Sequence, residues 1–232
     1  EVNQKIIKIG MPSAMQMFFE VALFTGAIWL CGMIGTTSQA ANQIALSLAS
    51  LTFMFAMGLS VTAMIRIGNQ KGLEDYVTLR KVAISIFLLT IIIEVVFALL
   101  FVLLHTSLPY IFVDINDFKN LTENLEVIAI SANLLLVAAV FQISDGLQVV
   151  VLGALRGLQD AKIPMYITFV AYWVIGFPIS IYLGLETELK AVGVWIGLLA
   201  GLTAAAIFLY IRFNYLTKKL VQGQTQEQVQ LQ

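Results

Sequence analysis

The chain has 232 residues, of which 59% are hydrophobic and only 12% are charged, whereas soluble domains are about 45–50% apolar and about 25% charged. This excess of apolar residues excludes an ordinary soluble domain and predicts a protein embedded in the lipid bilayer. The formal net charge of −1 offers no basic surface for phosphate backbones, which argues against nucleic acid as a partner.

Six stretches of about 20 apolar residues each match the length that a helix needs to cross a ~30 Å hydrocarbon core at ~1.5 Å per residue. In chain order they cover about residues 9–34, 40–67, 82–104, 125–155, 163–185 and 192–211. The sequence therefore predicts an all-α membrane domain of six transmembrane helices over residues 1–219. The glutamine-rich tail at 220–232 has too few apolar side chains to pack, so we expect it to be disordered.

Basic residues predict the orientation of the helices, because lysine and arginine near helix ends are retained on the cytoplasmic side. In a six-helix topology, 11 of the 13 basic residues fall on one side, and Lys119 and Lys190 fall on the other. Both ends of the chain are therefore expected to be cytoplasmic, in a multi-pass protein of the plasma membrane.

Three ionisable side chains, Glu20, Glu94 and Asp145, lie inside the predicted helices, ~16–20 Å from the nearest cytoplasmic basic residue at ~1.5 Å per residue. Such groups cost at least ~2.5–3.5 kcal/mol on insertion scales, so each requires an explanation. Gln142 shares a helix face with Asp145, and Gln16 lies one turn before Glu20. These polar neighbours favour a site that binds H⁺ or Na⁺, although buried, protonated carboxyls that hold helices together are the alternative. Glu94 has apolar neighbours, which favours the structural alternative.

A stripe of polar and methionine side chains follows one face of the second predicted helix, with Gln43, Ser50, Met54 and Met57 among its members. Methionine is flexible and polarisable, which suits a cavity for varied apolar ligands, but such a stripe can also be a packing seam. Both interpretations remain open.

Two further features concern helix shape and packing. Pro178 lies inside the fifth predicted helix, where it should kink or break the helix and is a candidate gating position. Gly193, Gly197 and Gly201 are spaced at four residues in the last helix, which predicts a close contact with another helix.

Several motifs together resemble the multidrug and toxic compound extrusion (MATE) transporters, in particular NorM-like members. The resemblance covers nearly the whole chain and is carried by Gly10-Met11-Pro12, Phe18-Phe19-Glu20, Gln39-Ala40-Ala41-Asn42-Gln43, Arg66-Ile67-Gly68-Asn69-Gln70-Lys71-Gly72, Gly153-Ala154-Leu155-Arg156-Gly157, Tyr172-Trp173-Val174-Ile175-Gly176-Phe177-Pro178 and Gly193-Val194-Trp195-Ile196-Gly197. The resemblance implies a twelve-helix transporter of two six-helix lobes, of which this chain would be the carboxyl-terminal lobe.

The same resemblance assigns cation binding to Glu20 and Asp145, which would hold Na⁺ if the protein is Na⁺-coupled. It assigns no role to Glu94. Phe141 is a departure, since some Na⁺-coupled members have a tyrosine there, and this departure puts Na⁺ selectivity in doubt.

The function that the resemblance implies is that of an antiporter, which would export amphipathic cationic organic compounds in exchange for Na⁺ or H⁺. It would use a coupling ion rather than a cofactor, and it would need the missing amino-terminal lobe as a partner.

One alternative is a flippase-like exporter of a lipid-linked or other organic substrate. The lack of a basic residue at midplane depth argues against that alternative. A non-transporting structural subunit is another alternative. An enzyme is not expected, because an intramembrane aspartyl protease needs two deep aspartates and only Asp145 is deep enough.

Overall fold

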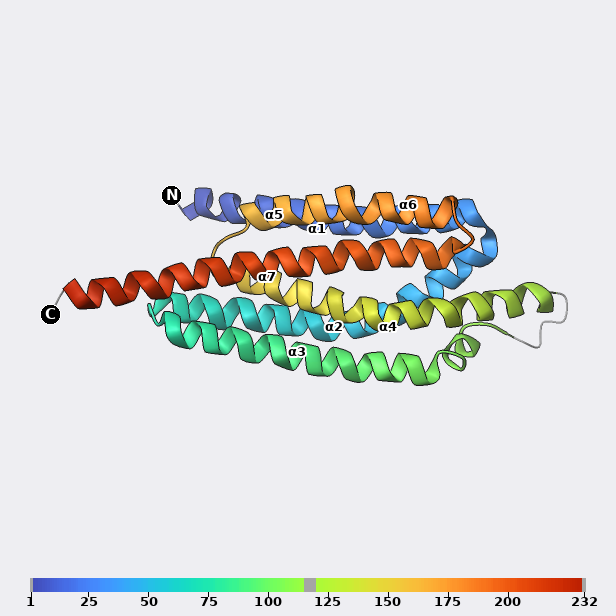
Figure 1. The fold of residues 1–232 in the computed structure, drawn as a ribbon, viewed down its shortest axis with the longest axis horizontal. Helices are drawn as coiled ribbons and strands as arrows, with labels where there is room; N and C mark the ends of the chain where they lie inside the picture. The colour runs from blue at the N-terminus through green and yellow to red at the C-terminus, as the bar shows by residue number, and fades with distance from the viewer. Residues whose placement is uncertain (1, 115–119, 231–232) are drawn as a thin grey trace.

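The computed structural model describes residues 2–114 and 120–230, and over these residues it contains helices and turns but no strands (Figure 1). The first half of the chain forms α1 (Val2–Ile34), α2 (Thr36–Gly72), α3 (Tyr76–Leu104) and the short 3-10 helix η1 (Leu108–Ile111). The second half forms α4 (Leu121–Gly157), α5 (Lys162–Phe169), η2 (Val170–Gly176), α6 (Phe177–Leu185) and α7 (Lys190–Gln230). Six segments are long and apolar enough to cross a membrane, with α5, η2 and α6 together forming the fifth. The predicted all-α membrane fold is thus confirmed.

The helices extend beyond the apolar stretches that predicted them. Hydropathy marks only the part of a helix that lies in hydrocarbon, whereas backbone hydrogen bonding continues through the polar residues that follow. The largest difference is at the carboxyl end, where α7 continues to Gln230. The structure thus differs from the expectation of a disordered tail, since it describes 220–230 as helix, and glutamine, the commonest residue there, is a good helix former. Residues 231–232, like Lys119 of the predicted outer loop, lie outside the described residues.

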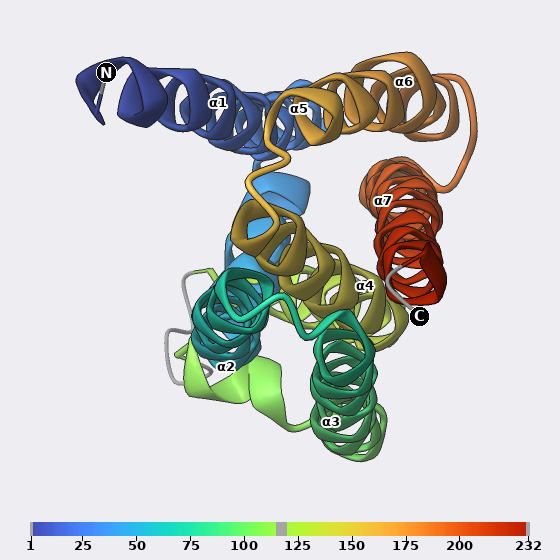
Figure 2. The same ribbon diagram turned by 90° about the vertical axis from the view of Figure 1, so that its left-hand side faces the viewer.

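The helix α4 occupies the middle of the bundle, where it packs against α2, α3 and α7. In the end view of Figure 2, α1, α5 and α6 form one row, α2 and α3 lie at the opposite side, and α4 and α7 lie between them. The helix α1 contacts α2 as well as α5 and α6. Both ends of the chain lie at the same end of the bundle (Figure 1).

The fifth membrane segment does not break at Pro178. The chain stays helical from Lys162 to Leu185, but the turns just before the proline, in η2, are π-helical. Proline lacks an N–H group and its ring crowds the carbonyl one turn earlier, and the wider π turns accommodate both effects.

Three glycines hold α7 against this segment. A side chain at Gly193 would collide with the backbone at Leu183, and one at Gly197 would collide with Ser180. A Cβ atom at Gly201 would lie 2.9 Å from the Cα of Gly176. The predicted close helix contact is confirmed, and it fixes η2 and α6 along α7.

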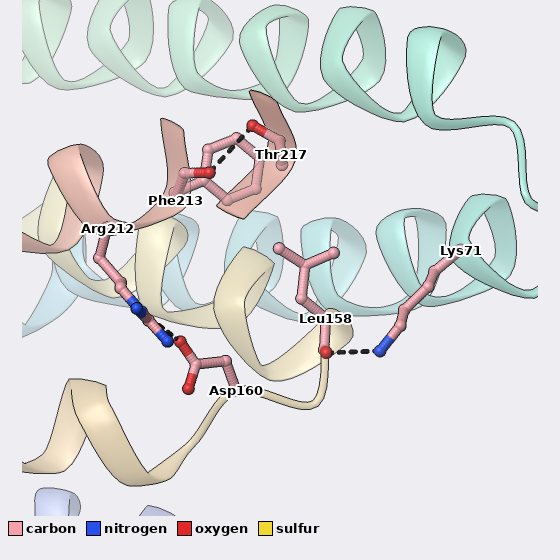
Figure 3. Close-up of polar contacts among 6 residues, drawn as sticks. All are labelled: Lys71, Leu158, Asp160, Arg212, Phe213 and Thr217. Carbon is pink, nitrogen blue, oxygen red and sulfur yellow. Dashed lines mark hydrogen bonds and ion pairs between the residues drawn. The ribbon is translucent and has the colours of Figure 1, made fainter. Parts of the chain in front are cut away.

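Polar contacts tie the loop between α4 and α5 to its neighbours at the end of the bundle that holds both termini (Figure 3). The Nε atom of Arg212 lies 2.8 Å from Oδ2 of Asp160. The Nζ atom of Lys71 donates to the carbonyl oxygen of Leu158 at 2.7 Å. These contacts connect the loop to α7 and to α2, and so fix the end of α4.

Candidate functional site

A cavity of about 390 Å³ lies between α1, α2 and α4. Six residues singled out from the sequence line it together, and these are Gln16 and Glu20 of α1, Gln43, Ser50 and Met57 of α2, and Asp145 of α4. Most of the other lining side chains are apolar. The cavity thus combines two carboxylates with an apolar wall.

Helical periodicity explains why α4 contributes to the cavity as it does. Phe141, Asp145, Val149, Leu152 and Arg156 are spaced by four, four, three and four residues, so they form one face of the helix, and all five line the cavity. The carboxyl group of Asp145 and the guanidinium of Arg156, near the carboxyl end of α4, therefore share one wall.

A guanidinium in the cavity was not expected. Because helical side chains lean toward the amino terminus of their helix, the long side chain of Arg156 points back toward Asp145. Its Nη2 atom donates to Oε1 of Gln16 at 2.6 Å, and Nε2 of Gln16 donates to Oε2 of Glu20 at 2.9 Å. Arg156 is one of the basic residues that predicted the topology, and its place on the Asp145 face of the helix could also have predicted this position.

The surroundings of Asp145 are almost closed to solvent, since its side chain is 6% exposed. Within the described ranges, its Oδ1 atom has no hydrogen-bond partner. Glu20 and Glu94 both lie within electrostatic range of it. An unpartnered buried carboxylate oxygen is free to bind a proton or a cation.

A second polar pair lies beside this group. Nε2 of Gln148 donates to the hydroxyl of Tyr172 at 2.7 Å, and both side chains are fully buried. The Tyr172 hydroxyl lies within electrostatic range of Glu20 and Asp145. No sequence pattern predicted this pair, because Tyr172 comes from η2 and meets α4 only through the tertiary fold.

Phe141, which departs from the tyrosine of some Na⁺-coupled transporters, lines the cavity wall. Its ring packs against Phe24 and Trp195, with centroids 6.0 Å and 5.1 Å away. Phe141 offers no hydroxyl to a cation, but Tyr172 brings a hydroxyl near the carboxylates from another helix.

Three predicted site residues lie elsewhere. Met54 is 69% exposed and is not among the cavity-lining residues, because it projects from the outer face of α2. Gln142 is buried, but its Nε2 atom donates to the backbone oxygen of Glu94 at 3.4 Å, so it faces α3 rather than the cavity. Pro178 does not line the cavity either.

The ligands available to a metal ion are limited. Among residues 2–114 and 120–230, no group of three or more His, Cys, Asp or Glu side chains could hold a metal ion. A Na⁺ ion near Glu20 and Asp145 would therefore also need a neutral oxygen, which the hydroxyl of Tyr172 can offer, whereas the side-chain oxygen of Gln16 already accepts from Arg156.

The six segments that could span a membrane and the cavity with two carboxylates describe a polytopic membrane protein with a polar site between its helices. The MatE family model matches residues 12–182 of the chain. The chain therefore belongs to the MatE family, as its motifs indicated.

Two relatives illustrate the match, both called "Probable multidrug resistance protein NorM". The one from Agrobacterium fabrum is 36% identical over 215 residues, which cover 93% of this chain and 45% of that protein. The one from Rhodopseudomonas palustris is 38% identical over 218 residues, with 94% and 45% covered. The chain thus spans slightly less than half the length of these relatives. Their names describe resistance proteins rather than enzymes, which agrees with the expectation that the chain is not an enzyme.

Solved structures show the same fold. The eukaryotic MATE transporter AtDTX14 matches with a TM-score of 0.81 at 20% identity, over 94% of this chain and 48% of that one. A MATE protein in complex with MaL6 matches with a TM-score of 0.85 at 16% identity, over 96% and 48%. The chain thus matches about half of each of these solved chains.

Proposed function

We propose that the full-length protein is a secondary active antiporter that exports amphipathic cationic organic compounds from the cell in exchange for H⁺ or Na⁺. One observation carries the proposal: two carboxylates, Glu20 and Asp145, line the same largely apolar cavity, and the sequence predicts that both lie near midplane depth. An organic cation and a coupling cation would both be attracted to these carboxylates. Binding of either cation lowers the affinity of the site for the other. This coupling lets the gradient of the coupling ion drive the export of the organic cation.

The transport pathway would need a second wall, because a central cavity is built from both halves of such a transporter. We propose that an amino-terminal six-helix lobe supplies this wall. Met17 and Val21 support this part of the proposal, since they line the cavity and are nevertheless 49% and 60% exposed. Both ends of this chain would be cytoplasmic, in keeping with the distribution of basic residues.

The test is transport of a fluorescent organic cation, such as ethidium, into inverted membrane vesicles that contain the full-length protein. Na⁺ and pH gradients are imposed separately, and the wild type is compared with Asp145→Asn and Glu20→Gln. We expect one gradient to drive accumulation of the dye and both variants to lose this drive. Glu123→Gln is the matched control, since Glu123 is an exposed carboxylate at the first turn of α4. Full gradient-driven transport in both cavity variants would contradict the proposal.

The Arg156 guanidinium favours a second candidate, a flippase-like exporter of an anionic lipid-linked substrate, because a cation in the cavity could bind a diphosphate. In proteoliposomes, such an exporter would translocate a diphosphate-linked lipid analogue and would lose this activity in Arg156→Gln. The first candidate predicts no translocation of this lipid. A non-transporting subunit would move neither the dye nor the lipid.

A further inference from the structure

Glu94 is not among the residues that line the cavity, and the proposed antiport mechanism does not use it. Its side chain is 1% exposed and projects from α3 toward α4. A Cβ atom at Gly146 of α4 would lie 2.8 Å from both Cγ and Oε1 of Glu94. The missing side chain at residue 146 therefore creates the space that the carboxyl group occupies.

The hydrogen bonds around Glu94 do not suit a negative charge. Over the residues that the structure describes, Oε2 of Glu94 and Oε1 of Gln142 both lack a hydrogen-bond donor. A buried ionised carboxylate without donors carries a large desolvation cost. A proton on Glu94 would remove the charge and would turn one carboxyl oxygen into a hydrogen-bond donor.

From these contacts we propose that Glu94 and Gly146 form a second proton-binding site, separate from the cavity and linked to it through Asp145. Glu94 is held there as the neutral acid between α3 and α4. Asp145 is the next residue to Gly146, and its carboxyl group lies within electrostatic range of Glu94. A charge on either carboxyl therefore disfavours a charge on the other.

Other titratable groups on the neighbouring helices lie farther along the bundle. The charged residues of α2, Arg66 and Lys71, are in its last two turns. On α7, the charged residues lie at Lys190 and from Arg212 onward, and Tyr210 packs against Phe87, two turns before Glu94. Asp145 is thus the group that links this site to the cavity.

The test is infrared spectroscopy of the full-length protein in lipid, without substrate and without a gradient. A protonated carboxyl gives a C=O stretching band that is distinct from that of a carboxylate. We expect such a band at pH 7 and its loss in Glu94→Gln. No change in the protonated-carboxyl region between the wild type and Glu94→Gln would overturn the proposal. Because no transport is measured, this result does not depend on the proposed function.

Two further variants test the packing and the linkage. Gly146→Ala should shift the Glu94 band because the new methyl group displaces the carboxyl, whereas Gly58→Ala, with nothing within 4 Å of the added Cβ, should not. In Asp145→Asn the band should disappear at lower pH than in the wild type, because the neighbouring negative charge is gone. An unshifted titration would overturn the linkage.

Discussion

The side chains of Arg156 and Gln16 meet across α4 and α1, with Nη2 of the arginine 2.6 Å from Oε1 of the glutamine. This bond fixes the orientation of the Gln16 amide, because the oxygen faces the guanidinium and Nε2 must then face Glu20. The arginine thereby acts on Glu20 through a buried amide as well as through its charge.

The first prediction concerns this contact. Arg156→Gln removes a charged hydrogen bond, and such bonds contribute about 1.5–3 kcal/mol. Since Arg156 is partly exposed, we expect the lower end of this range, which corresponds to a loss of about tenfold in the rate of gradient-driven dye transport. Arg66→Gln is the matched control, as Arg66 is an exposed arginine on α2. Equal rates in the two variants would refute a role for Arg156.

The glycine contact between α6 and α7 predicts a loss of stability. Gly197→Ala would force a methyl group into Ser180, and overpacking of this kind costs about 1–3 kcal/mol. The thermal unfolding midpoint of the purified protein in detergent should therefore fall. Gly58→Ala, which has open space around the added methyl group inside α2, should not lower the midpoint. A similar midpoint in both variants would mean that α6 and α7 can move apart without a loss in the free energy of unfolding.

The ion pair between Arg212 and Asp160 predicts a small coupling energy. The two side chains are 26% and 15% exposed, so the pair is partly screened by solvent and should contribute at most about 1 kcal/mol. A double-mutant cycle with Asp160→Asn and Arg212→Gln measures this coupling from unfolding midpoints. Strict additivity of the two substitutions would show that the pair does not stabilise the end of α4.

Asp75 predicts a local dependence on pH at the start of α3. The backbone N–H of Thr78 donates to Oδ1 of Asp75 at 3.0 Å, and hydrogen bonding to Thr78 lowers the pKa of this carboxyl below its usual value. A lowered folded-state pKa means that the contribution to stability is present above the unfolded-state pKa and is lost as the pH falls through the folded-state pKa.

Amide hydrogen exchange in the first turn of α3 measures this effect. Protection of the Thr78 amide should decrease in acid in the wild type, after correction for the intrinsic exchange rate. In Asp75→Asn the protection should no longer depend on pH in this range. A parallel decrease in both proteins would assign the change to a different group.

The sequence predicted those parts of the protein that depend on local periodicity. Six apolar stretches gave six spanning helices, and spacing by four placed Glu20 beside Gln16. The same rule placed the three glycines of α7 on one contact face. It failed for Met54 and Gln142, since a helical wheel gives the angle between two residues but not the neighbour that each one faces.

What only the tertiary structure decided is which helices meet, and with them the chemistry of the cavity. Arg156 and Gln16 are 140 residues apart, and Gln148 and Tyr172 come from different membrane segments. The carboxyl of Glu94 fits against α4 only because residue 146 lacks a side chain. Hydropathy and helical period are properties of a single segment, so they predict which of its residues are buried. Which residue of another helix each one contacts depends on the shapes of both helices, and this information is not contained in a single segment.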